Sequence, residues 1–190
     1  MKDNSKRYKF IIIGIVIFVL LVPVTYLVYY KLIAKSKRQT LALVVIPEGV
    51  KADSIVVYKS KRIMILFDNE RVIKDYNVSL GKNPDGRKEK EGDKKTPEGL
   101  YKIDYRNPDS KYYLSLHISY PDENDKLKAV ALGLNPGSDI MIHGLPNSMG
   151  FLKEYFINND WTDGCIAVTN EEIEEIWRVV NDGIPIMINP

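Results

Sequence analysis

The stretch Trp161-Thr162-Asp163-Gly164-Cys165-Ile166-Ala167-Val168 carries the only cysteine of this 190-residue chain. A single cysteine at the start of a predicted strand is, by itself, more often a small buried hydrophobe than a reactive group. The N-terminal segment, however, predicts that this part of the chain is exported, where a lone thiol has no disulfide partner within the chain and is open to oxidation. Since serine or alanine would pack as well, we interpret Cys165 as a residue retained for its reactivity.

Upstream of Cys165, the segment Ile140-Met141-Ile142-His143-Gly144 supplies a candidate base at the end of an apolar strand. Thiol catalysis requires a base that forms the thiolate and donors that stabilise the oxyanion. We expect His143 to meet Cys165 across a sheet, with the carbonyl of Gly144 holding the imidazole tautomer. The expected oxyanion donors are the amides of Gly164 and Cys165, because a glycine lets a substrate carbonyl approach the backbone closely. The pair predicts a cysteine-nucleophile enzyme.

Other chemically active side chains fit structural roles better. His117 lies in Ser115-Leu116-His117-Ile118-Ser119 with no second motif element around it, which favours a structural histidine. The spacing of Cys165, His143 and His117 matches no common zinc-ligand pattern, so the sequence predicts no metal site. The glycines between positions 81 and 99 lack the spacing of a phosphate-binding loop.

The N-terminal region predicts a membrane anchor. Residues 10–30 carry no charged side chain, and a helix of this length spans about 31 Å, enough for the ~30 Å hydrocarbon core of a bilayer. The stretch is longer than the apolar region of a cleavable signal peptide and lacks a small-residue cleavage site, which favours an uncleaved signal anchor. Lysines and arginines flank both ends of the span, so charge alone does not decide its orientation.

We therefore expect a short cytoplasmic tail (1–9), a transmembrane signal anchor (10–30), a stalk (31–53) and a catalytic domain (54–189). Because the tail before the span is short, we expect the amino terminus to stay in the cytoplasm. The chain is then a single-pass protein of the inner (cytoplasmic) membrane, with its catalytic domain on the periplasmic or extracytoplasmic side.

Charge is distributed unevenly along the chain. The first 39 residues hold eight of the 27 Lys and Arg but one of the 25 Asp and Glu. The remaining 151 residues therefore carry a net charge near −5, although the whole chain stands at +2. A nucleic-acid-binding surface needs a basic footprint, so we expect no nucleic-acid partner.

Local patterns predict a strand-rich domain with two helices. The clearer helix begins at Thr169, where Thr169 and Glu172 form a capping box ahead of an apolar stripe. A shorter helix is expected over residues 149–156. The Gly-, Pro- and charge-rich loop over residues 81–99 is long enough to be either functional or disordered. The predicted strands cover 54–59, 62–67, 71–79, 100–104, 112–119, 140–143, 165–168 and 184–188.

Three blocks of sequence, in their order, resemble the L,D-transpeptidase catalytic domain (the YkuD-type fold) of bacterial cell-wall enzymes. They are Thr96-Pro97-Glu98-Gly99-Leu100-Tyr101, Ile142-His143-Gly144 and Thr162-Asp163-Gly164-Cys165-Ile166. The resemblance covers about residues 54–189, and the three blocks together are highly specific. The long loop and the sequence from Asp163 to Asn170 are most similar to the YafK-like branch of the family.

The resemblance implies a mostly β (α+β) fold, a twisted β-sandwich-like domain with a few helices. It implies that Cys165 is the nucleophile, that His143 donates and accepts the proton, and that the Gly144 carbonyl orients the imidazole beside an oxyanion hole at Gly164. The implied substrates are peptidoglycan stem peptides. Cys165 would attack a carbonyl at an L,D junction, expel the terminal D-residue and pass the thioester to an amine. No cofactor is implied.

Two positions depart from the family pattern. Asp163 stands where the family commonly has a histidine, and Ala167 stands where it tends to have an arginine. If that arginine grips a substrate carboxylate, the role passes here to another residue. The expected substrate-binding residues are Thr162, Asp163 and Arg106, with Arg87 and Lys111 as further cations.

Three functions remain open at this point. The first is transfer of the stem peptide to an amine acceptor. The second is the same cysteine chemistry with water as acceptor, in a peptidoglycan L,D-carboxypeptidase or amidase that includes release of wall-linked protein. The third is a non-catalytic wall-binding scaffold, which the intact Cys165 and His143 argue against. Transfer and hydrolysis differ in how the site excludes water, which the sequence does not specify, and no protein partner is identified.

Overall fold

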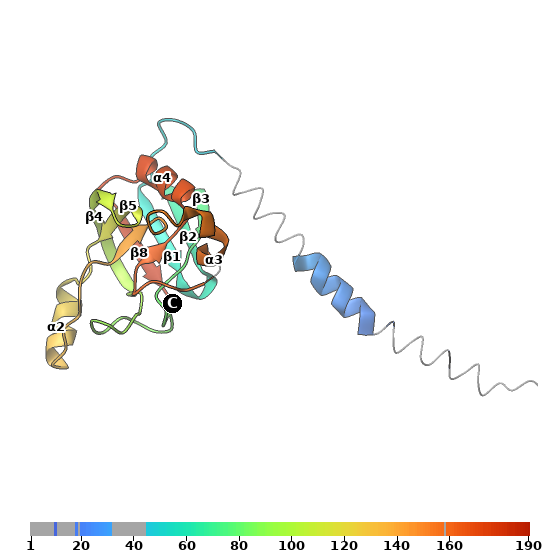
Figure 1. The fold of residues 1–190 in the computed structure, drawn as a ribbon, viewed down its shortest axis with the longest axis horizontal. Helices are drawn as coiled ribbons and strands as arrows, with labels where there is room; N and C mark the ends of the chain where they lie inside the picture. Colours follow the sequence, from blue (N-terminus) through green and yellow to red (C-terminus); the bar gives the residue numbers. More distant parts are fainter. Residues whose placement is uncertain (1–9, 11–17, 19, 32–44, 158) are drawn as a thin grey trace, which may run out of the picture. The chain divides into compact units, whose positions relative to one another are not determined.

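The computed structural model describes residues 10, 18, 20–31, 45–157 and 159–190 (Figure 1). The chain divides into two compact units, the second of which runs from Val45 to Pro190. In the first unit residues 20–31 are helical. Within the described residues, no helix combines the length and apolar character needed to cross a membrane. Part of the expected span, residues 11–17 and 19, lies outside the described residues.

The second unit is built on one mixed sheet of eight strands in the order β3-β2-β1-β8-β4-β5-β6-β7. Most neighbours are antiparallel, whereas β1 with β8 and β6 with β7 run parallel. The strands overlap the eight predicted segments with boundaries shifted by one or two residues, except that β4 extends six residues beyond the predicted 100–104. Their bounds are β1 Ser54–Tyr58, β2 Ile63–Asp68, β3 Arg71–Asn77, β4 Gly99–Ser110, β5 Tyr113–Ile118, β6 Met141–His143, β7 Ile166–Ala167 and β8 Pro185–Asn189.

Strand β4 makes the sheet continuous. Its first residues, Gly99 to Lys102, pair with β8, and its remainder pairs with β5. The β4–β5 register shifts twice, between Ile103 and Tyr105 and again between Asn107 and Ser110. Such irregularities bend a strand and increase its local twist. The α+β class is confirmed. The expected sandwich is instead a single curled sheet, because the long bent strand β4 pairs with β8 on one side and with β5 on the other.

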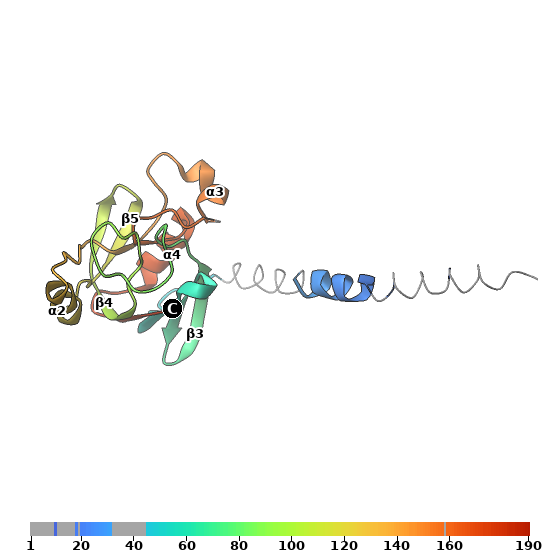
Figure 2. The same cartoon turned by 90° about the horizontal axis from the view of Figure 1, so that it is seen from below.

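The helical elements are η1 Lys59–Lys61, α2 Glu123–Ala131, η2 Gly150–Leu152, α3 Lys153–Ile157 and α4 Asn170–Val179. The capping box predicted for α4 is present, because the Thr169 hydroxyl accepts from the Glu172 amide and the Glu172 carboxylate accepts from Thr169. The helix predicted over 149–156 forms as η2 followed by α3. Helix α2 was not predicted. Its buried residues are Asp125 and Ala129, so its sequence lacks an apolar stripe, and it projects from the sheet in both views (Figures 1 and 2).

The hydrophobic core extends into part of the segment predicted as a stalk. Ile46 and Ala52 are almost fully buried and belong to the core that α4 covers with its apolar stripe. The Ala52 amide donates to the Val179 carbonyl at 2.9 Å, and the Arg178 guanidinium donates to the Ile46 carbonyl at 3.0 Å. The compact unit therefore begins before residue 54, at Val45.

Candidate active site

Cys165 lies directly before β7, in a loop that Thr162 closes. The Thr162 hydroxyl donates to the Cys165 carbonyl at 2.7 Å and accepts from the Gly164 amide at 3.2 Å. Gly164 has φ +133°, and a Cβ there would lie 2.7 Å from the Lys95 carbonyl oxygen. Only glycine fits this conformation and this close approach. The Gly164 amide, expected as an oxyanion donor, is therefore engaged with Thr162, which leaves the Cys165 amide as the remaining candidate.

His143 ends the neighbouring strand, β6. In the parallel pairing of β6 with β7, His143 is the register partner of Ala167. Cys165 lies two residues before Ala167, directly before β7 begins, so the pairing of β6 with β7 brings the cysteine loop beside the strand that ends at His143. The Val168 amide donates to the His143 carbonyl at 3.0 Å and fixes this register. The two residues predicted as a catalytic pair therefore lie on adjacent segments of the chain, and their catalytic roles stay a prediction.

The imidazole of His143 is fixed by the next residue. Its Nδ1 lies 2.7 Å from the Gly144 carbonyl oxygen. Since a carbonyl can only accept, Nδ1 carries the hydrogen and Nε2 carries the lone pair. Burial lowers the pKa of His143 to about 4, and the bond to Gly144 opposes this shift only in part. At neutral pH the ring is therefore uncharged, and its Nε2 can accept a proton.

Aromatic side chains enclose His143. The ring of Tyr112 lies 4.5 Å from the imidazole, centroid to centroid, and that of Trp161 lies 5.6 Å away. Phe156 from α3 packs against Trp161 at 4.9 Å. Sequence reasoning did not assign these aromatic residues to the site, although Trp161 directly precedes the cysteine motif. Their packing accounts for the nearly complete burial of His143.

The thiol of Cys165 is hydrogen-bonded to the segment that enters β6. Its Sγ lies 3.5 Å from the Asp139 carbonyl oxygen and also interacts with the Met141 amide. Burial raises the pKa of Cys165 to about 11, the negative charges of Asp139 and Asp163 add to the rise, and Lys88 opposes it. The resting thiol is thus protonated and bonded to backbone groups of its neighbour strand, while His143 bonds to Gly144.

Cys165 opens into a cavity of about 360 Å³. One wall comes from the long loop, through Lys88, Glu91, Gly92 and Lys94, and the other from residues 137–140. The loop is therefore part of the site, one of the two roles that its length predicted. The charged side chains of the lining are those of Lys88, Lys94, Glu91, Asp139 and Asp163.

A buried lysine holds the base of the long loop. Lys59 donates to the carbonyls of Gly86 and Thr96 at 2.7 and 3.0 Å and pairs with Glu98 at 2.8 Å. Closer to Cys165, the Gly81 amide donates to the Thr96 hydroxyl at 3.2 Å. These contacts fix the Thr-Pro-Glu-Gly block beside the cysteine loop.

The expected substrate-binding residues occupy three different environments. Thr162 is buried and closes the cysteine loop. Asp163 lines the cavity with a side chain that is 76% exposed, and it pairs loosely with Lys82 at 3.3 Å. Arg106 instead lies over the Trp177 ring at 5.1 Å and pairs with Asp182 at 3.2 Å. The structure therefore does not bring Arg106 to the cavity lining, because a cation–π contact and an ion pair hold it beside α4.

The two further cations named from the sequence are also absent from the lining of the Cys165 cavity. Arg87 pairs with Asp125 of α2 at 2.5 Å, and the carbonyl of Lys111 accepts from the Asn147 amide at 3.1 Å.

His117 lies 2.6 Å from Asp104 and stacks on Tyr105. Within the described part of the chain, no three His, Cys, Asp or Glu side chains are grouped so that they could hold a metal ion.

Comparison with known proteins places this sequence in a family. Residues 52–188 match the sequence model of one family, described as the L,D-transpeptidase catalytic domain. YafK of Escherichia coli K12, whose name makes it a candidate L,D-transpeptidase, is 27% identical over 136 residues, or 68% of this chain and 48% of YafK. The chain spans about half the length of the curated relatives it matches. The resemblance drawn from the three sequence blocks is confirmed.

Two solved structures share the fold at similar identity. The helical cell shape determining protein Pgp2 of Campylobacter jejuni is 26% identical with a TM-score of 0.54, and the match covers 74% of this chain and 48% of that one. Bd1075 of Bdellovibrio bacteriovorus is 28% identical with a TM-score of 0.50, covering 75% of this chain and 49% of that one.

Proposed function

The chain belongs to the family of L,D-transpeptidase catalytic domains, and we propose from this that it is a cysteine-dependent acyltransferase acting on peptidoglycan stem peptides. One observation carries the proposal beyond family membership. The only thiol of the chain lines a cavity of about 360 Å³ and lies directly before β7, which pairs with the strand that ends at a neutral, oriented histidine. This combination supplies a nucleophile, a proton acceptor and room for a peptide.

The reaction follows from these groups. Nε2 of His143 takes the thiol proton while Sγ of Cys165 attacks the carbonyl at the L,D junction, and the C–N bond of that junction breaks. The proton passes from His143 to the leaving amine of the D-residue, and a thioester remains. An acceptor amine then attacks the thioester, gives a proton to His143, and Cys165 recovers it as a thiol.

The resting hydrogen bonds bear on the first step. The thiol is bonded to the Asp139 carbonyl and to Met141 at rest, and these bonds must break before Sγ attacks a substrate. Both groups are neutral at rest, with pKa values of about 11 for Cys165 and about 4 for His143. Proton transfer is therefore coupled to attack on the substrate, rather than completed beforehand.

We place the enzyme in the inner membrane, anchored by residues 10–30, with the catalytic domain on the extracytoplasmic side where peptidoglycan lies. The support is the uncharged stretch of the sequence and the location of the substrate. Because Pgp2 is named for helical cell shape, a role in cell shape belongs to the same proposal. Labelling of Cys165 by a membrane-impermeant maleimide in intact spheroplasts supports this orientation, and protection until lysis contradicts it.

The experiment that tests the chemistry is mass spectrometry of the full chain incubated with a stem tetrapeptide. The expected product is a mass increase on Cys165 equal to the mass of the tetrapeptide minus that of the free terminal amino acid, absent in Cys165→Ser. Crosslinked dimers then identify transfer, whereas trimmed monomers alone identify the hydrolytic alternative. A chain that binds the wall but never forms the thioester would be the non-catalytic scaffold.

A further inference from the structure

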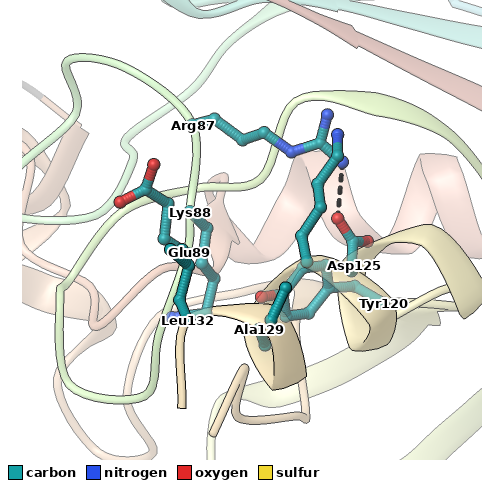
Figure 3. Close-up of a pocket in the computed structure, with 9 residues that line it drawn as sticks. Arg87, Lys88, Glu89, Tyr120, Asp125, Ala129 and Leu132 are labelled. Atoms are coloured by element: carbon teal, nitrogen blue, oxygen red, sulfur yellow. Dashed lines mark hydrogen bonds and ion pairs between the residues drawn. The ribbon is translucent and has the colours of Figure 1, made fainter. Parts of the chain in front are cut away.

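Lys88 is a buried cation in the wall of the Cys165 cavity that the sequence reasoning did not select. Its side chain is 3% exposed, although it lies in the charge-rich loop where lysines are ordinarily solvated. It lines the Cys165 cavity and also a neighbouring cavity of about 380 Å³ beneath α2. Figure 3 shows Lys88 in that second cavity, near Tyr120 and beside the Arg87–Asp125 pair.

Two hydrogen bonds hold the ammonium group of Lys88, and they use only part of its N–H donors. Its Nζ donates to the Lys90 carbonyl at 3.0 Å and to Asp93 Oδ1 at 2.8 Å, and it lies 6.0 Å from the centroid of the Tyr120 ring. An ammonium has three N–H donors. Two are used in these contacts, which leaves one N–H without a hydrogen-bond acceptor among the described residues.

Asp93 positions Lys88 without being mobile itself. Its carboxylate accepts from the amides of Glu89, Lys90 and Lys95 as well as from Lys88. Burial by itself would raise the pKa of Asp93, but these hydrogen bonds bring it below the usual value. Three backbone amides stabilise the negative charge of Asp93 together with Lys88. The Asp93 carboxylate therefore does not depend on Lys88 alone, and the ammonium can bind a second anion.

Few cations line the Cys165 cavity, which limits the residues that could bind an anionic group of a ligand. Ala167, which stands where the family resemblance predicts an arginine, is buried and uncharged, so it offers no cation. The remaining cation of the lining, Lys94, is exposed and forms no ion pair within the described residues. The ammonium of Lys88 is instead buried, held by Asp93 and part of the lining of the cavity that contains Cys165, which makes it the candidate cation for a ligand there.

Resting on the proposed function, we propose that Lys88 binds the terminal carboxylate of the residue that Cys165 expels. In a stem peptide this carboxylate is attached to the same carbon as the scissile nitrogen, so one cavity accommodates both the reacting carbonyl and the carboxylate. Lys88 is then the specificity residue that confines the reaction to the last residue of a peptide. It takes the place of an arginine that this chain lacks after its cysteine.

A test that does not depend on turnover uses the single thiol. Cys165 is alkylated with iodoacetate and with iodoacetamide, which differ by one carboxylate, and the ratio of the two rates cancels any change in the thiol pKa. Lys88→Met is expected to lower the iodoacetate-to-iodoacetamide ratio about three- to tenfold. The double variant Lys88→Met/Asp93→Asn, which leaves no unpaired buried carboxylate, is expected to lower it as well. The matched control is Lys90→Met, an exposed lysine of the same loop.

The second measurement uses a stem tetrapeptide and its C-terminal amide as acylating substrates. The wild type is expected to favour the free carboxylate by roughly tenfold to a hundredfold in kcat/KM, a preference that Lys88→Met loses and Lys88→Arg retains in part. An alkylation ratio unchanged by Lys88→Met, or equal losses on acid and amide, overturns the role of Lys88. Absence of any thioester in the wild type instead overturns the proposed function, while the alkylation ratio still decides the role of Lys88.

Discussion

The hydroxyl of Thr162 lies 2.7 Å from the carbonyl oxygen of Cys165 and 3.2 Å from the Gly164 amide, so a single oxygen closes the loop that carries the thiol. The threonine is buried, and its own amide donates to Leu80 at 3.1 Å. The residue therefore shapes the backbone on which Cys165 is presented.

Replacing Thr162 by Val is expected to destabilise the domain by about 2 kcal/mol, because two polar backbone groups lose their partner. Thr162→Ser keeps the hydroxyl and should cost less than half as much. Urea unfolding monitored by tryptophan fluorescence measures both values. Equal stability of the Val and Ser variants would show that the hydroxyl does not hold the loop.

Gly164→Ala is expected to cost more than about 2 kcal/mol and to abolish acylation, because its Cβ would lie 2.7 Å from the Lys95 carbonyl at φ +133°. Gly183→Ala is the matched control. Gly183 also has a positive φ, +91°, but nothing lies within 4 Å of the added Cβ. The control should lose about 1 kcal/mol and keep its activity. If both variants lose the same stability, backbone strain rather than the contact with Lys95 explains the glycine.

His143 predicts a specific dependence of stability on pH. Its pKa falls from 6.5 to about 4 on folding, chiefly by burial, so the unfolded chain binds a proton in this window and the folded chain does not. Stability is unaffected above pH 6.5 and decreases as pH falls toward 4, by about 3 kcal/mol for this residue.

His143→Gln removes this contribution and is expected to lose less stability than the wild type between pH 7 and pH 4.5. Urea unfolding of the two proteins across that range measures the difference, and the carboxylates common to both cancel. Parallel curves would mean that the histidine is solvated in the folded state.

The burial of the Cys165 thiol predicts how its alkylation rate depends on pH. Alkylation of Cys165 by iodoacetamide is expected to rise through a pKa of about 11, and at pH 8 only about 0.1% of the thiol is ionised. Asp163→Asn removes a nearby negative charge that raises this pKa, so its rate at pH 8 is expected to be severalfold higher. The exposed Asp109 provides the control variant, Asp109→Asn, which should match the wild type. A profile centred near 8.5 contradicts the burial of the thiol.

Local sequence patterns predicted much of the fold. Each of the eight strands and the α4 capping box follows from alternation, turn residues or a helix-start motif, all of which act over short distances. Helix α2 was not predicted because its buried residues are Asp125 and Ala129, and Asp125 is held by Arg87 and the Tyr101 hydroxyl. Those contacts join residues far apart in the chain, which no local period reveals.

The site was predicted unevenly for the same reason. Cys165, His143 and the Gly144 carbonyl were predicted from short motifs, and β7, which follows Cys165, pairs with β6, which ends at His143. Lys88 looks like one more solvated charge in the sequence, and its burial depends on how residues 86–95 fold around Asp93. Arg106 was a choice among exposed cations, and the Trp177 ring and Asp182 hold it elsewhere.

The raised pKa of Cys165 also lowers the rate at which its thiol is oxidised in the absence of substrate. Peroxides attack the thiolate rather than the thiol, and with a pKa of about 11 only about one molecule in ten thousand is ionised at pH 7. An ordinary thiol would be ionised to a few per cent at the same pH. The burial that raises this pKa thus slows oxidation of the thiol, so the proposed nucleophile is preserved until a substrate binds.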